Sequence, residues 1–213
     1  MTHFEILSQL IHDKIVAIVR LDSGEELMKV TEALKAGGIR AIEFTLTTPG
    51  ALEMIAQARA AFGENVLLGA GTVLDPETAR AAILAGAEFI VTPATNFETI
   101  KLCKRYGKPV MPGALTPTEI LNAWEAGADF VKVFPITAMG GADYIKAVTA
   151  PLPQIRLAPT GGISAENAAA FLKAGATALG VGGKLVDKGA VAKGDWAAIT
   201  AEAKKLVAAV TNV

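Results

Sequence analysis

The sequence predicts an α/β fold in which eight parallel strands alternate with helices and close into a (β/α)8 barrel. Four segments repeat one pattern, in which a helix end is followed by a glycine and then by a short apolar strand. The gap between successive repeats leaves room for one more strand and helix. The length of 213 residues suits a single domain of this class. A doubly wound open sheet is the alternative, because the period alone does not exclude it.

The repeats and the segments between them give the elements in order. The even-numbered strands are expected over residues 41–43, 89–91, 130–132 and 178–180, each preceded by a repeat glycine. The odd-numbered strands are expected over residues 14–19, 66–72, 109–112 and 155–159. Helix starts with suitable capping residues follow at Asp75-Pro76, Thr116-Pro117-Thr118-Glu119 and Ser164-Ala165-Glu166-Asn167. We expect one domain over residues 1–213, with a short N-terminal helix before the barrel.

The amino-acid composition argues against several classes of protein. Apolar residues make up 52% of the chain and charged residues 19%, with a net charge of −1. This balance excludes a disordered chain and gives no support to nucleic-acid or membrane-surface binding. No apolar run reaches the length of a transmembrane helix, and the N-terminus lacks the layout of a signal peptide. A cytoplasmic protein is therefore expected.

Histidines and cysteines are too few for several common kinds of site. His3 and His12 are the two histidines, and both precede the first strand, so neither a His-ligated metal site nor a Ser-His-Asp site is expected. No glycine pattern of a dinucleotide site opens a helix after a strand. The single Cys103 cannot form an internal disulfide, and we expect it to pack in the core from a helix.

Lys132 is the most informative residue, because it lies in the middle of the apolar strand Phe-Val-Lys-Val-Phe at residues 130–134. A lysine is rarely buried, since its ammonium group is costly to remove from water. Burial favours the neutral amine, and a neutral amine attacks carbonyl groups to form Schiff bases. Alternatively, Lys132 extends to the rim of the barrel or pairs with a carboxylate such as Asp129.

Glu43 is predicted to share the barrel interior with Lys132. When the four repeats are aligned, these two residues occupy the same position as Val91 and Gly180, and alternate strands contribute one interior layer. The small Gly180 leaves room beside the charged side chains. A carboxylate and an amine in an enclosed layer are costly unless they are used or paired, so the pair is either catalytic or a buried salt bridge. The loops after the strands favour catalysis.

Two glycine-rich loops lie where barrels of this class commonly bind phosphate, after strands 7 and 8. They are Pro-Thr-Gly-Gly-Ile-Ser at residues 159–164 and Gly-Val-Gly-Gly-Lys at residues 180–184. Glycines let backbone N–H groups approach an anion, and Lys184 adds a positive charge. Arg20, at the end of the first strand, is a second candidate ligand for an anion. Polar or turn-forming residues also end strands 3, 4 and 5, at Thr72, Thr92-Pro93 and Pro112-Gly113.

Six motifs, in order, resemble the class I 2-keto-3-deoxy-6-phosphogluconate (KDPG) and 4-hydroxy-2-oxoglutarate (KHG) aldolase family. They are EFTLT at residues 43–47, GAGTVL at 69–74, VTP at 91–93, PG at 112–113, KVFP at 132–135 and PTGGI at 159–163. The resemblance extends from about residue 14 to the last helix. It implies a homotrimer, and a mechanism that needs no metal ion or organic cofactor.

The resemblance also implies roles for individual residues. Lys132 would be the Schiff-base lysine and Glu43 the acid/base. Thr72, Pro93 and Phe134 would bind the keto acid, and Thr160, Gly161 and Gly162 would form the pyruvate-side and phosphate loop. Further substrate-binding candidates, from their places at strand ends and in loops, are Arg20, Thr47, Gly182, Gly183 and Lys184. Two of these depart from the pattern of some members, because Thr47 stands in place of an arginine and Lys184 in place of a serine. Both positions lie toward the distal end of the substrate, so the resemblance specifies the lyase chemistry more closely than the substrate.

The expected activity is cleavage of KDPG to pyruvate and glyceraldehyde 3-phosphate, and of KHG to pyruvate and glyoxylate. Small 2-keto acids and aldehydes are the expected partners, besides further copies of the chain. Three alternatives stay open. They are a 2-keto-3-deoxy-6-phosphogalactonate aldolase with the same machinery, a phosphate-binding barrel isomerase or synthase that uses Glu43 without an imine, and a non-catalytic trimeric scaffold.

Overall fold

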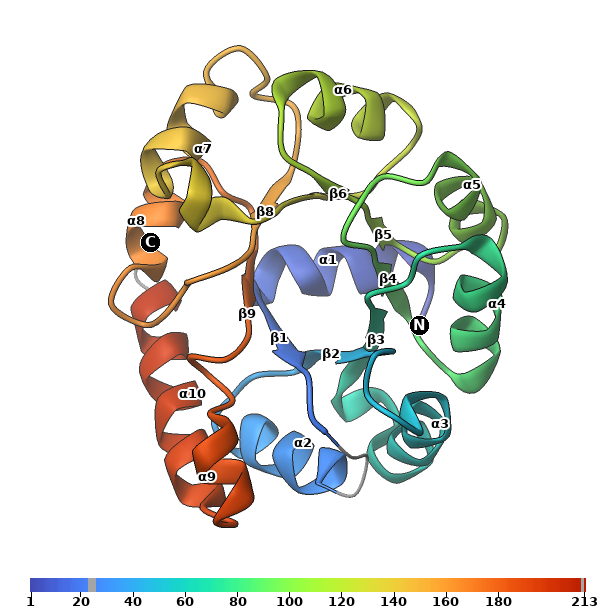
Figure 1. Cartoon of the computed structure of the whole chain (residues 1–213), viewed down its shortest axis with the longest axis vertical. Coiled ribbons are helices and arrows are strands. Elements are labelled where there is room, and N and C mark those ends of the chain that lie inside the picture. Colours follow the sequence, from blue (N-terminus) through green and yellow to red (C-terminus); the bar gives the residue numbers. More distant parts are fainter. Residues whose placement is uncertain (23–25, 212) are drawn as a thin grey trace.

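The computed structural model of the chain describes residues 1–22, 26–211 and 213. Its strands are arranged around a centre, with helices on the outside (Figure 1). The strands are β1 (Ile15–Val19), β2 (Ala41–Thr45), β3 (Leu67–Gly71), β4 (Phe89–Val91), β5 (Val110–Met111), β6 (Gly113–Ala114), β7 (Val131–Val133), β8 (Leu157–Pro159) and β9 (Leu179–Val181). The ladders between neighbouring strands are parallel, as predicted.

The strands form a curled sheet in two hydrogen-bonded parts. The six-stranded part has the order β5-β4-β3-β2-β1-β9, and the three-stranded part has the order β6-β7-β8. This order places β9 beside β1, whereas a doubly wound open sheet would reverse its strand order at a switch point. A parallel bridge between Thr160 and Gly180 lies where the two parts meet. The curled parallel sheet therefore agrees with the predicted fold class and not with the open-sheet alternative.

The strand predicted over residues 109–112 is wrong in its bounds, because the structure has two short strands there. β5 pairs with β4 and β6 pairs with β7, and Pro112 lies between them. Proline has no N–H to donate to a ladder, so the hydrogen bonding is interrupted at that residue. The other strands lie within two residues of their predicted bounds.

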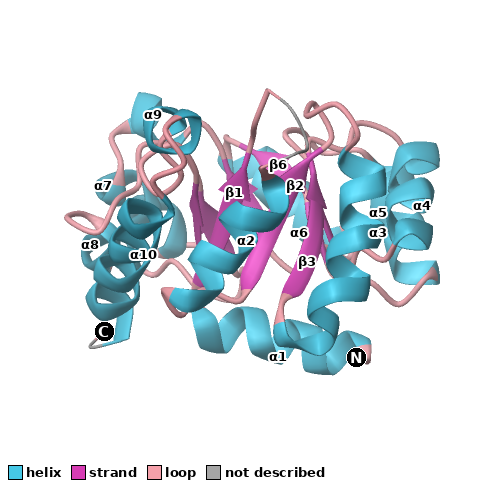
Figure 2. Ribbon diagram, turned by 90° about the horizontal axis from the view of Figure 1, so that it is seen from below, coloured by secondary structure: helices cyan, strands magenta, loops and turns pink. Residues whose placement is uncertain are grey.

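The helices are α1 (His3–Asp13), α2 (Leu27–Ala36), α3 (Ala51–Phe62), α4 (Pro76–Ala85), α5 (Phe97–Arg105), α6 (Pro117–Glu125), α7 (Ala142–Thr149), α8 (Ala168–Lys173), α9 (Lys188–Ala192) and α10 (Trp196–Thr211). Helices α2 to α8 connect successive strands on the outside of the sheet, whereas α1 precedes β1 and both α9 and α10 follow β9. Two 3-10 turns lie at Gly63–Asn65 and Ile136–Met139. The predicted N-terminal helix, α1, crosses the amino-terminal end of the strands, behind them in Figure 1 and beneath them in Figure 2. Both ends of the chain lie on that side, away from the loops that follow the strands (Figure 2).

The predicted helix starts are confirmed at two places and wrong at a third. Asp75 caps α4 by accepting a backbone N–H, and the capping box over residues 116–119 begins α6. Helix α8 begins at Ala168 instead of Ser164, because the side chain of Asn167 accepts the N–H of Ser164 and closes a turn in front of the helix. The repeat glycines that end helices with a positive φ are Gly38, Gly86, Gly127 and Gly175.

Two apolar cores hold the fold together. The larger lies between the sheet and the outer helices and includes Cys103, as predicted. Burial raises the pKa of the Cys103 thiol to about 12. The smaller core fills the centre of the curl at its amino-terminal end, where Ile6 and Leu10 of α1 cover it. Its strand residues are Val16, Ala41, Leu67, Phe89, Val91, Met111, Phe130, Ala158 and Ala178.

The described part of the chain contains no helix with the length and apolar character needed to cross a membrane.

Candidate active site

Glycines leave space in the centre of the curl at the carboxyl ends of the strands. A Cβ on Gly71 would overlap the carboxylate of Glu43, and a Cβ on Gly180 would overlap the hydroxyl of Thr160. Larger residues at these two positions would displace the side chains of Glu43 and Thr160. The small residues therefore make room for two polar side chains at this end of the sheet.

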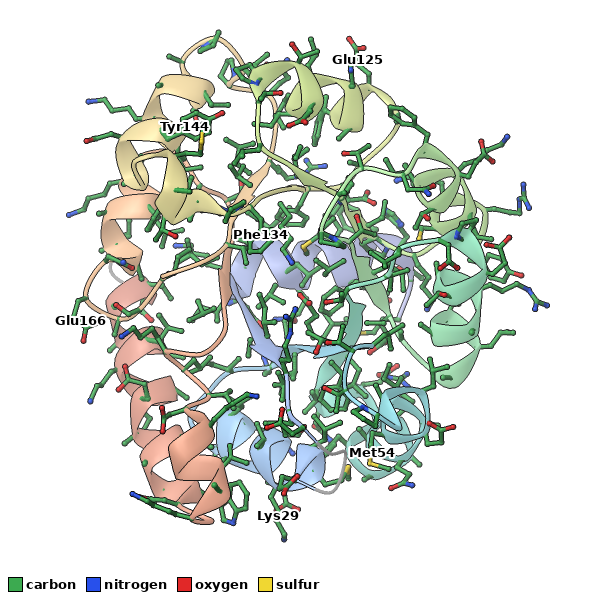
Figure 3. All side chains as sticks on the ribbon, in the orientation of Figure 1. Lys29, Met54, Glu125, Phe134, Tyr144 and Glu166 are labelled. Atoms are coloured by element: carbon green, nitrogen blue, oxygen red, sulfur yellow. The ribbon has the colours of Figure 1, made fainter. Side chains whose placement is uncertain are left out.

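Lys132 is enclosed in the middle of β7, where its residue is 7% exposed. Its ladder partners on the two neighbouring strands are Gly113 and Ala158, which are small. The Nζ atom lies 5.3 Å from the centre of the Phe134 ring. Figure 3 shows Phe134 on the inner side of the ring of strands, whereas Lys29 and Glu125 lie at the outer surface. The prediction of a lysine buried in an apolar strand is confirmed.

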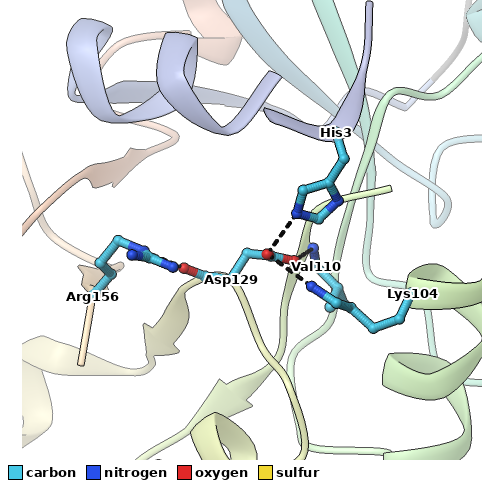
Figure 4. A network of polar contacts seen from close by, with 5 residues as sticks. All are labelled: His3, Lys104, Val110, Asp129 and Arg156. Carbon is cyan, nitrogen blue, oxygen red and sulfur yellow. Dashed lines mark hydrogen bonds and ion pairs between the residues drawn. The ribbon is translucent and has the colours of Figure 1, made fainter. Parts of the chain in front are cut away.

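The alternative pairing of Lys132 with Asp129 is wrong. The carboxylate of Asp129 accepts hydrogen bonds from His3 Nε2 at 2.9 Å, Lys104 Nζ at 3.0 Å and the N–H of Val110 at 3.0 Å (Figure 4). These partners lie at the amino-terminal end of the sheet. Asp129 and Lys132 are an odd number of residues apart, and side chains of successive strand residues leave opposite faces.

Glu43 lies on β2 and is 1% exposed. Its Oε1 atom accepts no hydrogen bond from the described residues. Burial raises the pKa of this carboxyl, and the positive charges of Lys132 and Arg20 oppose that rise. Among the described residues, Lys132 Nζ forms no ion pair with Glu43, since the two groups are not within 4.0 Å of each other. The buried salt bridge is therefore wrong as the account of this pair, and Glu43 is a buried carboxyl that holds its proton to a higher pH than usual.

A pocket of about 700 Å³ opens above Lys132 at the carboxyl ends of the strands. The predicted site residues among its lining are Arg20, Thr72, Pro93, Lys132, Phe134, Thr160, Gly161, Gly162, Gly182, Gly183 and Lys184. The structure thus brings together residues from six strands or the loops after them. Glu43 is not part of the lining, since it lies buried in the sheet. Thr47 is not part of it either, because it is exposed in the loop after β2 and donates to Thr45 Oγ1 at 3.3 Å.

Thr72 is held in the pocket by an unusual backbone conformation. Its φ of 58° lies in the left-handed region, which a β-branched residue rarely adopts. Arg20 Nη2 donates to Thr72 Oγ1 at 3.2 Å, so the end of β1 is tied to the end of β3. Residues in such strained conformations cluster at functional sites, where the surrounding structure imposes them. This second observation marks Thr72 as part of the site independently of the motif in the sequence.

Positive charge predominates around the pocket. Its charged lining residues are Arg20, Lys132, Lys184 and Lys188 against the single carboxylate of Asp187. The Asp187 carboxylate already accepts the N–H of Ala190 at the start of α9. Gly161 and Gly162 have φ values of 108° and 68°, so a side chain at either position would be strained. A pocket with this charge and this accessible backbone suits a small substrate with two anionic groups.

Five lining residues were not identified from the sequence. They are Ile18, Ile163, Val186, Asp187 and Lys188. The period of two along β1 would have placed Ile18 on the same face as Arg20. Lys188 follows a loop whose path depends on contacts with distant segments, so no local signal in the sequence marks it.

Other hollows among the described residues carry fewer groups suited to catalysis. A more open hollow of about 760 Å³ lies along α1 and is lined by Met1, Thr2, Phe4, Glu5, Ser8, Gln9, His12 and Glu64. It contains no lysine or arginine and lies away from the carboxyl ends of the strands. Across residues 1–22, 26–211 and 213, no three His, Cys, Asp or Glu side chains are grouped so that they could hold a metal ion.

The fold and the pocket define an α/β enzyme whose pocket lining has a lysine as its most enclosed charged residue, as in enzymes that form imines with carbonyl substrates. Residues 6–202 match the profile of the KDPG and KHG aldolase family. A 2-dehydro-3-deoxy-phosphogluconate aldolase of Treponema pallidum is 38% identical over 201 residues, which cover 94% of this chain and 93% of the relative. A 2-dehydro-3-deoxy-6-phosphogalactonate aldolase of Escherichia coli is 38% identical over 82% of this chain and 85% of its own.

Solved structures are also similar to this chain. The crystal structure of a KDPG aldolase from Legionella pneumophila, with pyruvate captured at low pH as a covalent carbinolamine intermediate, superposes with a TM-score of 0.87. It is 28% identical and covers 94% of this chain and 97% of its own. The chain belongs to the KDPG and KHG aldolase family and is an aldolase, a carbon–carbon lyase. The resemblance stated from six motifs is confirmed.

Proposed function

We propose that this chain is a class I aldolase that cleaves KDPG to pyruvate and glyceraldehyde 3-phosphate, and KHG to pyruvate and glyoxylate. The observation that carries the proposal is Lys132, enclosed in an apolar strand at the base of a pocket whose charged residues are mainly positive. The Legionella relative, whose crystal structure holds pyruvate in a covalent carbinolamine, supports the same chemistry here.

The proposed mechanism begins with attack of the neutral amine of Lys132 on the C2 carbonyl of the keto acid. The resulting carbinolamine loses water to give an iminium ion, which serves as the electron sink. Glu43, directly or through a water molecule, accepts the proton of the 4-hydroxyl as the C3–C4 bond breaks. The aldehyde leaves, and the electrons of the broken bond form an enamine. Protonation of that enamine and hydrolysis of the imine release pyruvate and restore Lys132.

The pKa of Glu43 suits this role. A carboxyl whose pKa is raised by burial is a stronger base when ionised, and it can return its proton at neutral pH. We assign Thr72, Pro93 and Phe134 to the keto-acid end of the pocket. Thr160, Gly161, Gly162, Gly182, Gly183, Lys184 and Arg20 are assigned to the anionic groups of the substrate. We assign no contact to Thr47, since it lies outside the pocket.

Trapping with borohydride tests the proposal directly. Pyruvate and sodium borohydride should reduce the imine and leave a stable adduct on Lys132, detected by mass spectrometry of peptides. Lys132→Arg should form no adduct and show no turnover, because its guanidinium stays protonated and cannot attack. The exposed Lys173 gives the matched control, and Lys173→Arg should behave as the wild type. An adduct on another lysine, or none in the wild type, would favour an isomerase, a synthase or a non-catalytic scaffold.

A 2-keto-3-deoxy-6-phosphogalactonate aldolase is the second candidate. The Escherichia coli 2-dehydro-3-deoxy-6-phosphogalactonate aldolase and the Treponema pallidum relative have the same sequence identity to this chain, 38%. The two substrates differ in stereochemistry at C4, so the measurement is kcat/KM for each of them with the same preparation. Higher efficiency on the galactonate would replace KDPG in the proposal and leave the chemistry at Lys132 unchanged.

We propose that the curled sheet is an eight-stranded barrel, with β5 and β6 counted as one strand and the bridge between Thr160 and Gly180 as its seam. We propose a homotrimer in the cytoplasm. Two exposed apolar side chains, Leu74 in the loop after β3 at 63% and Phe97 at the start of α5 at 55%, support burial against another copy. Phe97→Glu should then reduce the mass measured by sedimentation, while a wild type that sediments as a monomer would remove the proposal.

A further inference from the structure

Lys188, in the wall of the pocket, forms an ion pair with Asp22, which lies outside the pocket lining. Lys188 Nζ lies 2.8 Å from Asp22 Oδ1, and the pair joins the loop after β1 to the start of α9. The two side chains are 61% and 90% exposed. Exposed pairs of this kind contribute little to stability, so a role in folding does not account for the contact.

Lys188 also belongs to the wall of the pocket, together with Lys184. The turn between the two lysines is fixed by its apolar residues, because Leu185 and Val186 are 2% and 5% exposed. Their N–H groups donate to the carbonyl of Gly182 at 2.8 and 3.0 Å. The two lysines are therefore carried on an anchored turn next to the glycines assigned to an anion. Lys188 differs from Lys184 in having a carboxylate in direct contact.

The Asp22 carboxylate opposes the binding of an anion at Lys188. A negative charge within hydrogen-bonding distance offsets the attraction that the ammonium exerts on a ligand. A phosphate carries more charge than a carboxylate and offers three acceptor oxygens, so it competes for Lys188 better than a carboxylate does. An uncharged distal hydroxyl would not displace Asp22. The pair can therefore discriminate between substrates by the charge of their distal ends.

We propose that Lys188 determines specificity for a phosphorylated distal end of the substrate, and that Asp22 weakens that contact by holding Lys188 when the pocket is empty. The inference rests on the proposed function and deepens it, because it names the charge that distinguishes phosphorylated from unphosphorylated substrates. On binding, Lys188 Nζ exchanges Asp22 for a phosphate oxygen. No covalent bond changes, so the effect falls on KM and not on the steps at Lys132.

The test compares KDPG with 2-keto-3-deoxygluconate, which is the same acid without its phosphate. Lys188→Met keeps the length of the side chain and removes its charge, and it should raise KM for KDPG about tenfold, as expected for a lost charged hydrogen bond. KM for the unphosphorylated acid should stay within about twofold. Lys193→Met, an exposed lysine at the end of α9 outside the pocket lining, is the matched control and should change neither value.

Asp22→Asn should act in the opposite direction. Removal of the competing carboxylate should lower KM for KDPG about two- to fivefold, the range of an exposed ion pair. The same substitution in the Lys188→Met background should have no effect, because Asp22 acts through Lys188. Both effects should shrink as the salt concentration rises.

An equal rise in KM on both substrates in Lys188→Met, no rise on either, or a higher KM for KDPG in Asp22→Asn would overturn the inference. Trapping of pyruvate with borohydride distinguishes an error in the role of Lys188 from an error in the proposed imine chemistry. Pyruvate has no distal end, so wild type and all variants should form the Lys132 adduct equally. Intact trapping with unchanged KM values would remove Lys188 alone, whereas loss of trapping in the wild type would remove both proposals.

Discussion

The two ends of the centre of the curled sheet are built from the same strands and have opposite contents. At the amino-terminal end, Leu67, Phe89 and Phe130 fill the centre and pack with α1. At the carboxyl end, Gly71 and Gly180 make room for the polar side chains of Glu43 and Thr160, and a pocket opens above Lys132. Residues that point inward alternate along each strand, so a change in side-chain size two residues further on converts core into site.

The polar groups of the two ends differ in the same way. Asp129, near the amino-terminal end, is fully engaged by His3, Lys104 and the N–H of Val110 (Figure 4). Glu43, toward the carboxyl end, has an oxygen that accepts no hydrogen bond from the described residues. A satisfied carboxylate stabilises the fold, whereas an unsatisfied one is available for proton transfer. The comparison predicts that substitutions at one end change stability and substitutions at the other change turnover.

The largest effect is expected at Glu43. Glu43→Gln keeps the shape and removes the base, so turnover should fall by about 10²–10⁴ while formation of the pyruvate imine partly survives. Near-normal turnover with lower thermal stability would show that Glu43 is structural and would overturn the proposed mechanism.

The stability of Glu43→Gln should also depend on pH in a defined direction. Because burial raises the pKa of Glu43 in the folded state, the unfolded chain loses this proton first as the pH rises. Wild type should therefore lose stability relative to Glu43→Gln as the pH rises above the ordinary glutamate range, until the folded carboxyl is itself ionised. Denaturant unfolding of both proteins at acidic and mildly alkaline pH measures this difference.

The next effect is expected at Phe89, in the filled end. Phe89 is fully buried, and its ring occupies the space that a Cβ on Gly69 would need. Phe89→Ala should lower the free energy of unfolding by about 3–5 kcal/mol through the lost burial and the cavity left behind. The Phe89→Ala protein, where folded, should keep its KM for KDPG near the wild-type value. A comparable loss in Leu84→Ala, where the side chain is 63% exposed, would show that the inner cluster contributes nothing special.

The smallest of the three effects is expected at Asp129. Asp129→Asn retains an acceptor for the N–H of Val110 but removes the charge that pairs with His3 and Lys104. We expect a loss of about 1–3 kcal/mol in unfolding free energy with unchanged kcat. Glu98→Gln, which breaks the exposed pair with Lys101, is the matched control and should change stability by less than about 1 kcal/mol. A fall in kcat without a fall in stability would place Asp129 in the site and contradict the comparison.

Local patterns were enough to predict the repeats, the strands and most of the caps. The capping boxes and the repeat glycines act within a few residues, so the sequence carries their whole cause. The shared interior position of Glu43 and Lys132 was predicted from the alignment of the four repeats, because alternate strands contribute one interior layer. The start of α8 was missed because Asn167 bonds backward to the loop instead of capping the helix.

What the sequence did not predict depends on contacts between distant segments. The ion pair of Lys188 with Asp22 joins residues 166 positions apart. The left-handed backbone of Thr72 and its bond from Arg20 arise only when β1 and β3 end at the same rim. The charged partners of Asp129, which are His3 and Lys104, come from α1 and α5, and no period along β7 reveals them.

The position of α1 has a practical consequence for handling the enzyme. Both chain ends lie on the α1 side of the molecule, opposite the loops that form the pocket (Figure 2). A tag, a fused domain or a covalent tether at either end would therefore extend away from the mouth. Molecules attached to a support in this way would present their pockets to the surrounding liquid, and substrate would reach them without passing the support.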